Sequence, residues 1–218
     1  MPRKWAVSTS DRRSYHHGDL RAALQQSALQ LLDAEGVDAL SLRAVARHAG
    51  VSPNAPYRHY RDKDALLAAL AAHGFTELAA RLTDAIAHPA APGADGADRA
   101  ELAETTAAMA RATVHYALEH PGLFHLMFGH PCIGHPEVIS ASDAAQSVVA
   151  THLAAFVPPE AGESLKIGVW ALVHGLSVLL LGGRLGALTP DRTDSLIDAV
   201  VHTLLDTGAA RTTPRADR

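Results

Sequence analysis

The stretch SLRAVARHAGVSPNAPYRHY, residues 41–60, decides the fold of the N-terminal part of the chain. It opens with Ser41, a residue type that caps helices, and apolar residues follow at helical spacing. Gly50 interrupts this helix, because glycine tolerates the positive φ of a tight turn. A second short helix is expected through Tyr57 to about Tyr60. A helix, a tight turn and a second helix at this spacing predict a helix-turn-helix.

Helical periodicity continues on both sides of this stretch. Before it we expect a helix capped by Asp19 and ending at Gly36, and after it a long helix capped by Asp62 and ending before Pro89. No segment shows a sustained alternating β-pattern, so the fold class is predicted to be all-α: an N-terminal three-helix helix-turn-helix domain and a larger C-terminal helical domain. Pro and Gly separate most of the further helices, which are expected at about 99–120, 121–128, 136–156, 159–184 and 190–206.

Composition is typical of a cytoplasmic globular protein. The 218 residues are 48% hydrophobic, and Cys132 is the only cysteine, which excludes an intramolecular disulfide. Residues 1–14 have no apolar run of the length that a signal peptide needs. Between Lys166 and Arg184 only His174 can carry a charge, but this stretch is marginal for a bilayer, which needs about twenty residues. We therefore expect no membrane partner and interpret the stretch as a helix buried on nearly all sides.

Charge divides the chain in two. Residues 1–63 carry ten Lys and Arg against six Asp and Glu, whereas the remainder carries nine against seventeen. A basic head on an acidic body is typical of a DNA-binding domain joined to a domain of another function.

The expected organisation has four parts. Residues 1–14 form a flexible basic N-terminal arm, 15–63 the helix-turn-helix domain, 64–207 the helical regulatory and dimerisation domain, and 208–218 a disordered tail. Residues 89–100, rich in Ala, Pro, Gly and Asp, form a flexible connection. Basic residues around Arg12 and Arg13 either lie along DNA or belong to a solvated tail, and the sequence leaves both open.

Ten residues then carry a family resemblance: Ser41, Ala46, Gly50, Val51, Ser52, Tyr57, His59, Tyr60, Lys63 and Leu66. Together they resemble the TetR family of bacterial regulators, and a generic helix-turn-helix does not require an aromatic pair followed by Lys. The resemblance implies a sequence-specific DNA-binding regulator, a dimeric repressor that a small-molecule effector of unknown identity releases from a palindromic operator on double-stranded DNA.

Recognition of DNA requires small or polar residues at the start of the second helix, so that its backbone approaches the bases. Asn54 could pair with adenine and Arg43 with guanine, whereas the other side chains suit phosphates. Tyr57 and Tyr60 could instead be core aromatics. The expected DNA-contact residues are Ser41, Arg43, Ser52, Pro53, Asn54, Tyr57, His59, Tyr60 and Lys63.

Pro56 departs from the family, in which an apolar residue such as Leu is common at this position. Proline removes a backbone donor, so the second helix could begin later than Ser52. If Asn54 is the cap, Pro56 falls harmlessly in the first turn, but the Asn54 side chain is then used at the helix end instead of on adenine.

The C-terminal part resembles the TetR subgroup named for its Trp, His and Gly signature, through Trp170, His174 and Gly175 and the segment 120–124. That resemblance implies a ligand pocket between helices. Each candidate for its lining could equally be core: Met109, Tyr116, Phe124, Phe128, Trp170 and His174. The strongly apolar helix at 159–184, followed by an amphipathic one, predicts a four-helix interface in a homodimer.

Other functions find little support in the sequence. His120, His125, His130, Cys132 and His135 fall close together without a recognisable ligand motif, so we expect no metal and no cofactor. Fingerprints of hydrolases and nucleotide-binding enzymes are missing from the sequence, so we do not expect an enzyme. A ligand-independent DNA-binding protein with a structural chromosomal role is the alternative, and a well-packed C-terminal core would favour it.

Overall fold

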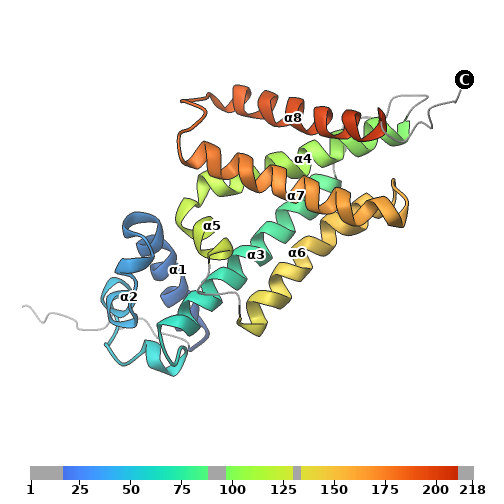
Figure 1. The fold of residues 1–218 in the computed structure, drawn as a ribbon. Helices are drawn as coiled ribbons and strands as arrows, with labels where there is room; N and C mark the ends of the chain where they lie inside the picture. Colours follow the sequence, from blue (N-terminus) through green and yellow to red (C-terminus); the bar gives the residue numbers. More distant parts are fainter. Residues whose placement is uncertain (1–16, 88–96, 130–133, 211–218) are drawn as a thin grey trace, which may run out of the picture. The chain divides into compact units, whose positions relative to one another are not determined.

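A computed structural model describes residues 17–87, 97–129 and 134–210 (Figure 1). The regular elements of this part of the chain are all helical, as predicted. The chain divides into two compact units, residues 1–63 and 64–218. The predicted arm and most of the predicted connection lie outside the described residues. The last helix ends at Ala210, inside the predicted tail, because alanines favour continuation of a helix.

From residue 17 onward, the first unit consists of two α-helices and two short 3-10 helices around a small apolar core. Leu24 and Ala28 are fully buried on the first helix, and Leu40 and Val45 join them from the following segments. The first helix begins two residues before Asp19, which therefore lies in its first turn and not at its cap. The elements are α1 (His17–Glu35), η1 (Val37–Ala39), α2 (Leu42–His48) and η2 (Pro56–Arg58).

Both ends of α2 follow from its sequence. The Ser41 side-chain oxygen accepts a hydrogen bond of 3.1 Å from the Ala44 N–H, which confirms Ser41 as the N-cap. At the other end the Val51 N–H donates to the Ala46 carbonyl at 3.0 Å, a Schellman closure. Gly50 has a φ of 67° in this closure, a value that disfavours side chains with a Cβ.

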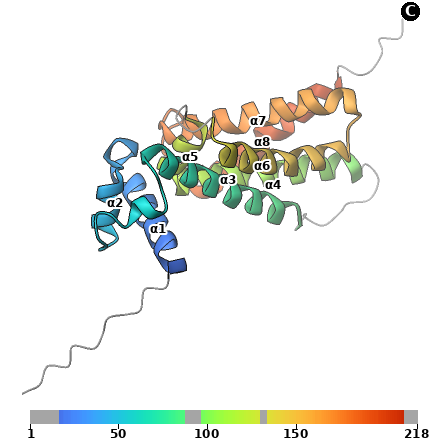
Figure 2. The same ribbon diagram turned by 90° about the horizontal axis from the view of Figure 1, so that it is seen from below.

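The described residues of the second unit form six helices (Figures 1 and 2). Four of them begin with a proline at the first helical position, where its missing N–H costs no hydrogen bond. All six lie where the sequence predicts helices. They are α3 (Lys63–Ala87), α4 (Ala97–Glu119), α5 (Pro121–Phe128), α6 (Pro136–Ala154), α7 (Pro159–Leu181) and α8 (Pro190–Ala210).

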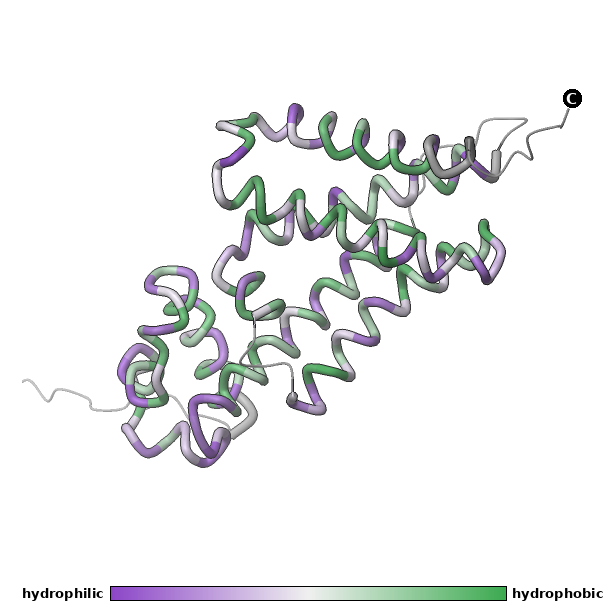
Figure 3. The backbone as a smooth tube through the Cα atoms, viewed as in Figure 1, coloured by the Kyte–Doolittle hydropathy of each residue, from purple (hydrophilic) through white to green (hydrophobic). Residues whose placement is uncertain are grey.

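A central apolar cluster joins α4 to both α7 and α8. Apolar residues recur along these three helices (Figure 3). The α4 members are small or β-branched, which lets the two neighbouring helices pack closely against the same helix. The buried members are Ala107, Ala110, Val114, Val169, Val173, Leu176, Ile197 and Val201.

Close packing of α5 against α3 depends on Gly74. A Cβ at this position would lie 2.6 Å from Met127 Sδ and 3.2 Å from Leu123 Cγ. A larger residue would therefore require the Met127 and Leu123 side chains of α5 to shift. This approach also brings Phe75 and Phe128 into edge contact, with ring centroids 5.4 Å apart.

The outer face of α7 is not covered by its own chain. Val178 and Leu179 on this face are both 44% exposed. The prediction that this helix is buried on nearly all sides is wrong for the single chain, because hydrophobicity does not specify how many neighbours a helix has. Among the described residues, α3 and α7 are the two helices long and apolar enough to span a membrane, with 56% and 22% of the relevant windows buried.

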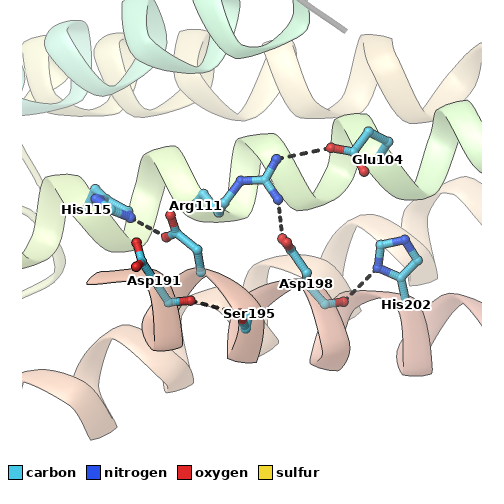
Figure 4. A network of polar contacts seen from close by, with 8 residues as sticks. Glu104, Arg111, His115, Asp191, Ser195, Asp198 and His202 are labelled. Carbon is cyan, nitrogen blue, oxygen red and sulfur yellow. Dashed lines mark hydrogen bonds and ion pairs between the residues drawn. The ribbon is translucent and has the colours of Figure 1, made fainter. Parts of the chain in front are cut away.

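Ion pairs at the edge of the apolar cluster link α4 to α8 (Figure 4). Arg111 donates to Glu104 at 3.2 Å on its own helix and to Asp198 on α8. Burial lowers the pKa of Arg111, but the hydrogen bonds and charges of Asp198 and Glu104 outweigh it and raise the pKa overall. One turn along, His115 Nε2 and Asp194 Oδ1 are 2.6 Å apart.

We predict that Arg111→Met lowers the free energy of unfolding by about 1–2 kcal/mol, because two partly buried carboxylates lose their shared donor. Arg99→Met is the matched control: Arg99 joins the same two helices through Asp206, but this pair is largely exposed. The control should change stability by less than about 0.5 kcal/mol. Urea denaturation followed by circular dichroism measures both, and equal effects would contradict the prediction.

Candidate nucleic-acid interface and ligand cavity

The segment between Gly50 and Lys63 forms the second half of the helix-turn-helix. Its expected helix is the 3-10 helix η2, limited to Pro56–Arg58. The Ala55 N–H donates to the Ser52 carbonyl at 2.9 Å, but Pro56 has no N–H with which to continue toward an α-helical ladder. The expectation of a helix through to Tyr60 is corrected accordingly.

Neither candidate cap is used by η2. Its N-cap is Ala55, with no side-chain hydrogen bond, whereas Ser52 and Asn54 are exposed just before it. The Asn54 amide is therefore not used at the helix end. Its availability for a base edge is compatible with the predicted adenine contact.

Exposure separates the two tyrosines of this segment. Tyr57 is 49% exposed, whereas Tyr60 is 3% exposed and packs in the core. The predicted DNA contact of Tyr60 is therefore wrong, because Tyr60 follows the end of η2, where the chain turns back into the core beside the buried Pro56. His59 is half-buried. The other exposed candidates are Ser41, Arg43, Ser52, Pro53 and Asn54.

Two predicted phosphate contacts also have structural partners. The half-buried Lys63 donates from Nζ to the Val37 carbonyl at 2.8 Å, which ties the start of α3 to η1 inside the first unit. Ser41 uses its side-chain oxygen as an acceptor at the α2 cap. Each retains donor capacity, since an ammonium has three N–H groups and the serine O–H is still free to donate.

Three exposed basic side chains extend the candidate surface beyond the predicted set. Arg47 and His48 occupy the last turn of α2, and Arg58 directly follows Tyr57 in η2. The signal that could have found them was the density of basic residues within residues 43–61.

An apolar cavity of about 80 Å³ lies in the second unit among α3, α4, α6 and α7, with Phe128 of α5 also in its wall. A groove of about 510 Å³ adjoins it between α6 and α7. Cavity and groove share four lining residues, so they form one continuous site along α6 and α7. The shared residues are Phe75, Phe128, Ser142 and Trp170.

Four of the six predicted lining residues are found there. Met109 lines the cavity, His174 the groove, and Phe128 and Trp170 line both. Tyr116 and Phe124 are buried core residues that line neither space, which corrects the prediction.

The rings of Tyr116 and Phe124 pack against other side chains and not against the cavity or the groove. The Tyr116 hydroxyl donates to Glu77 at 3.3 Å, and the Arg81 guanidinium lies 4.9 Å from the Tyr116 ring centroid. The ring of Phe124 stacks on that of His174, with centroids 5.5 Å apart, and so packs against a residue that lines the groove.

Four polar side chains of the cavity lining are not predicted from the sequence. Thr113, Ser142, Gln146 and Lys166 lie among apolar residues of three different helices. Their spacing in the sequence does not bring them together, because the site is assembled only when α4, α6 and α7 pack.

His174 is an ionisable group of the groove whose pKa is shifted by its surroundings. Burial lowers its pKa, and the positive charge of nearby His125 lowers it further. Its Nδ1 is buried without a hydrogen-bond partner, beside the rings of Phe124 and Phe128. The neutral imidazole is therefore the favoured form at this end of the groove.

Comparison with known proteins gives matches in both units. Residues 24–70 match the family model of bacterial regulatory proteins of the tetR family, and residues 106–204 match that of the tetracyclin repressor-like C-terminal domain. The chain belongs to the TetR family. It is therefore a transcriptional regulator with a DNA-binding helix-turn-helix.

Individual proteins with known structures or sequences match most of the chain. A Rhodococcus sp. RHA1 protein of unknown function is 34% identical, with a TM-score of 0.75, over 90% of this chain and 98% of its own. A tetR-family regulatory protein from Rhodococcus RHA1 shares the fold at 18% identity, with a TM-score of 0.61, over 86% and 95% of the two chains. The HTH-type transcriptional regulator YobS of Bacillus subtilis is 24% identical over 71% of this chain and 75% of its own.

Two predictions are not tested by the match to the TetR family: the Trp, His and Gly subgroup, and the expectation that the histidine-rich segment binds no metal. No group of three potential metal ligands occurs among the described residues, while His130 and Cys132 of the histidine-rich segment lie outside them.

We predict that the free energy of unfolding decreases as the pH falls from about 7.5 to about 5.5. Burial lowers the pKa of His152 and His174 in the folded protein below the ordinary value of 6.5. The unfolded chain therefore binds more protons over this range, which makes the folded state less stable as the pH falls. Urea titrations of wild type, His152→Gln, His174→Gln and the double variant measure this slope. A double variant as steep as wild type would contradict the assignment.

Proposed function

We propose that this regulator is a cytoplasmic dimeric repressor that binds a palindromic operator and is released when a small molecule occupies the cavity. The observation that carries the proposal is the presence in one chain of an exposed basic helix-turn-helix surface and a separate apolar cavity. A protein with a purely structural chromosomal role has no need of such a cavity, so the cavity favours a ligand-responsive regulator.

On the DNA side, the proposal assigns base contacts to Arg43 and Asn54. Arg43 is exposed near the start of α2, and its guanidinium can bond the O6 and N7 atoms of guanine. Asn54 can form the corresponding pair of hydrogen bonds with adenine. Tyr57, His59 and Lys63 then contact phosphates and fix the position of the domain on the duplex.

Dimerisation is proposed through the uncovered face of α7. Gly168, Ala171, Gly175 and Val178 recur along this helix at spacings of three and four, and Ala171 also lines the adjoining edge of the groove. A Cβ added at Gly168 or Gly175 would meet nothing within 4 Å, so both glycines face open space. Small residues allow a second copy of α7 to approach closely, and the resulting two-fold axis fits a palindromic site.

Selection of binding sequences from random double-stranded DNA tests the regulator. The operator recovered is then titrated by fluorescence anisotropy at several salt concentrations, with unrelated DNA as the control. We expect selective binding that weakens steeply with salt, as when a dimer neutralises about 6–10 phosphates. Failure to enrich any sequence would overturn the proposal.

Removal of one base contact gives a residue-level prediction. Arg43→Met should weaken operator binding by about 1–3 kcal/mol, roughly 5- to 150-fold, and relax the base preference at one position in each half-site. Arg99→Met removes the same charge from the second unit and should leave operator affinity unchanged. Equal losses in the two variants would indicate that net charge, and not a base contact, is responsible.

The proposed dimer leads to a prediction about oligomeric state. Wild-type protein should sediment as a dimer at micromolar concentration, whereas Leu179→Asp, on the uncovered face of α7, should sediment as a monomer because it would bury an unpaired charge. Leu118→Asp is the control, since Leu118 is similarly exposed at 40% but lies on α4. A dimeric Leu179→Asp protein would place the interface elsewhere.

A further inference from the structure

The cavity lining contains a single ionisable side chain among the described residues. Lys166 is the only charged group in a wall that otherwise consists of apolar residues and three uncharged polar ones, Thr113, Ser142 and Gln146. An ammonium at the edge of an apolar space is stabilised by an anion, because few other groups there can solvate it.

The anion that Lys166 meets in the chain itself is weakly held. Lys166 Nζ lies 2.8 Å from Glu163 Oε2, one turn earlier on α7. The Glu163 side chain is 68% exposed, whereas the Lys166 side chain is 26% exposed. Exposed pairs of this kind contribute little, so a carboxylate arriving from the cavity side can replace or share this partner.

The groove differs from the cavity in its electrostatic character. His174 and Asp143 line the groove and not the cavity, and a carboxylate beside Asp143 would be repelled by its side chain. The distance along α7 from Lys166 to His174 is about 12 Å, at a rise of about 1.5 Å per residue. Between Lys166 and His174 the walls are largely apolar and include the exposed side chains of Ile139, Ile167 and Trp170.

We propose that the cavity and groove bind an apolar monocarboxylic acid, whose carboxylate pairs with Lys166 and whose apolar body lies between α6 and α7 toward His174. Lys166 thereby determines the charge of the ligand, and Asp143 fixes its orientation. A neutral or cationic molecule of the same shape gains the apolar contacts but lacks the ion pair. This inference names the effector class for the proposed function and rests on the cavity being the effector site.

Fluorescence of Trp170 provides a direct binding assay on the full chain. Trp5 and Trp170 are the two tryptophans, so Trp5→Phe leaves Trp170, in the wall of the site, as the only one. Decanoic acid, 1-decanol and decylamine serve as probes of equal chain length at neutral pH. We expect decanoic acid to bind at least about tenfold more tightly than the other two, the range for a hydrogen-bonded charge pair.

Variants of Lys166 test the assignment of that preference. Lys166→Met should remove the preference for the acid while 1-decanol still binds, and Lys166→Glu should favour decylamine. Arg184→Met, an exposed cation outside the lining, should retain the wild-type order. Circular dichroism and operator binding confirm that each variant is folded.

Two results would overturn the inference: equal affinities of wild type for the three probes, including no binding of any, or an acid preference that survives Lys166→Met. The effect of decanoic acid on operator binding is read separately. Acid binding that depends on Lys166 without release of DNA would support the ligand class and contradict the effector role in the proposed function.

Discussion

Packing of α4 against both α7 and α8 is the interaction on which the second unit depends. Its apolar cluster supplies the favourable burial, while the ion pair of Arg111 with Asp198 at its edge fixes the register of α8. The cavity is a consequence of the same packing. Ala110, Val169 and Val173 belong to the cluster and also line the cavity, so one side of this core is the wall of the site.

Two prolines impose a comparable constraint on the DNA-binding unit. Pro53 and Pro56 lack backbone donors and restrict φ, which limits the second half of the helix-turn-helix to a turn and a single 3-10 helix. Fewer backbone N–H groups then face the DNA, and more of the recognition falls on side chains. The exposed Asn54, Tyr57 and Arg58 side chains lie where this recognition would take place.

Helix positions were predictable from the sequence, because Pro and Gly mark their ends by local chemistry: α5 to α8 each begin with proline, and Gly50 closes α2. The environments of individual side chains were less predictable from the sequence. Tyr116 and Phe128 are both aromatic at helical spacing, yet only Phe128 lines the site, since this depends on which helix packs opposite. The same limit explains the errors for Tyr60 and for the outer face of α7, and the missed Lys166.

Regulation by a ligand requires that the ligand bind the conformations of the dimer with different affinities. One side of α7 lines the cavity, and an adjacent side carries the stripe of small residues that is proposed to meet a second copy. In the proposed function, expansion of the cavity around a ligand would displace both sides of α7 together, because the helix is closely packed. Reciprocity would follow: an operator that favours one spacing of the proposed dimer would weaken ligand binding by the same factor by which the ligand weakens DNA binding.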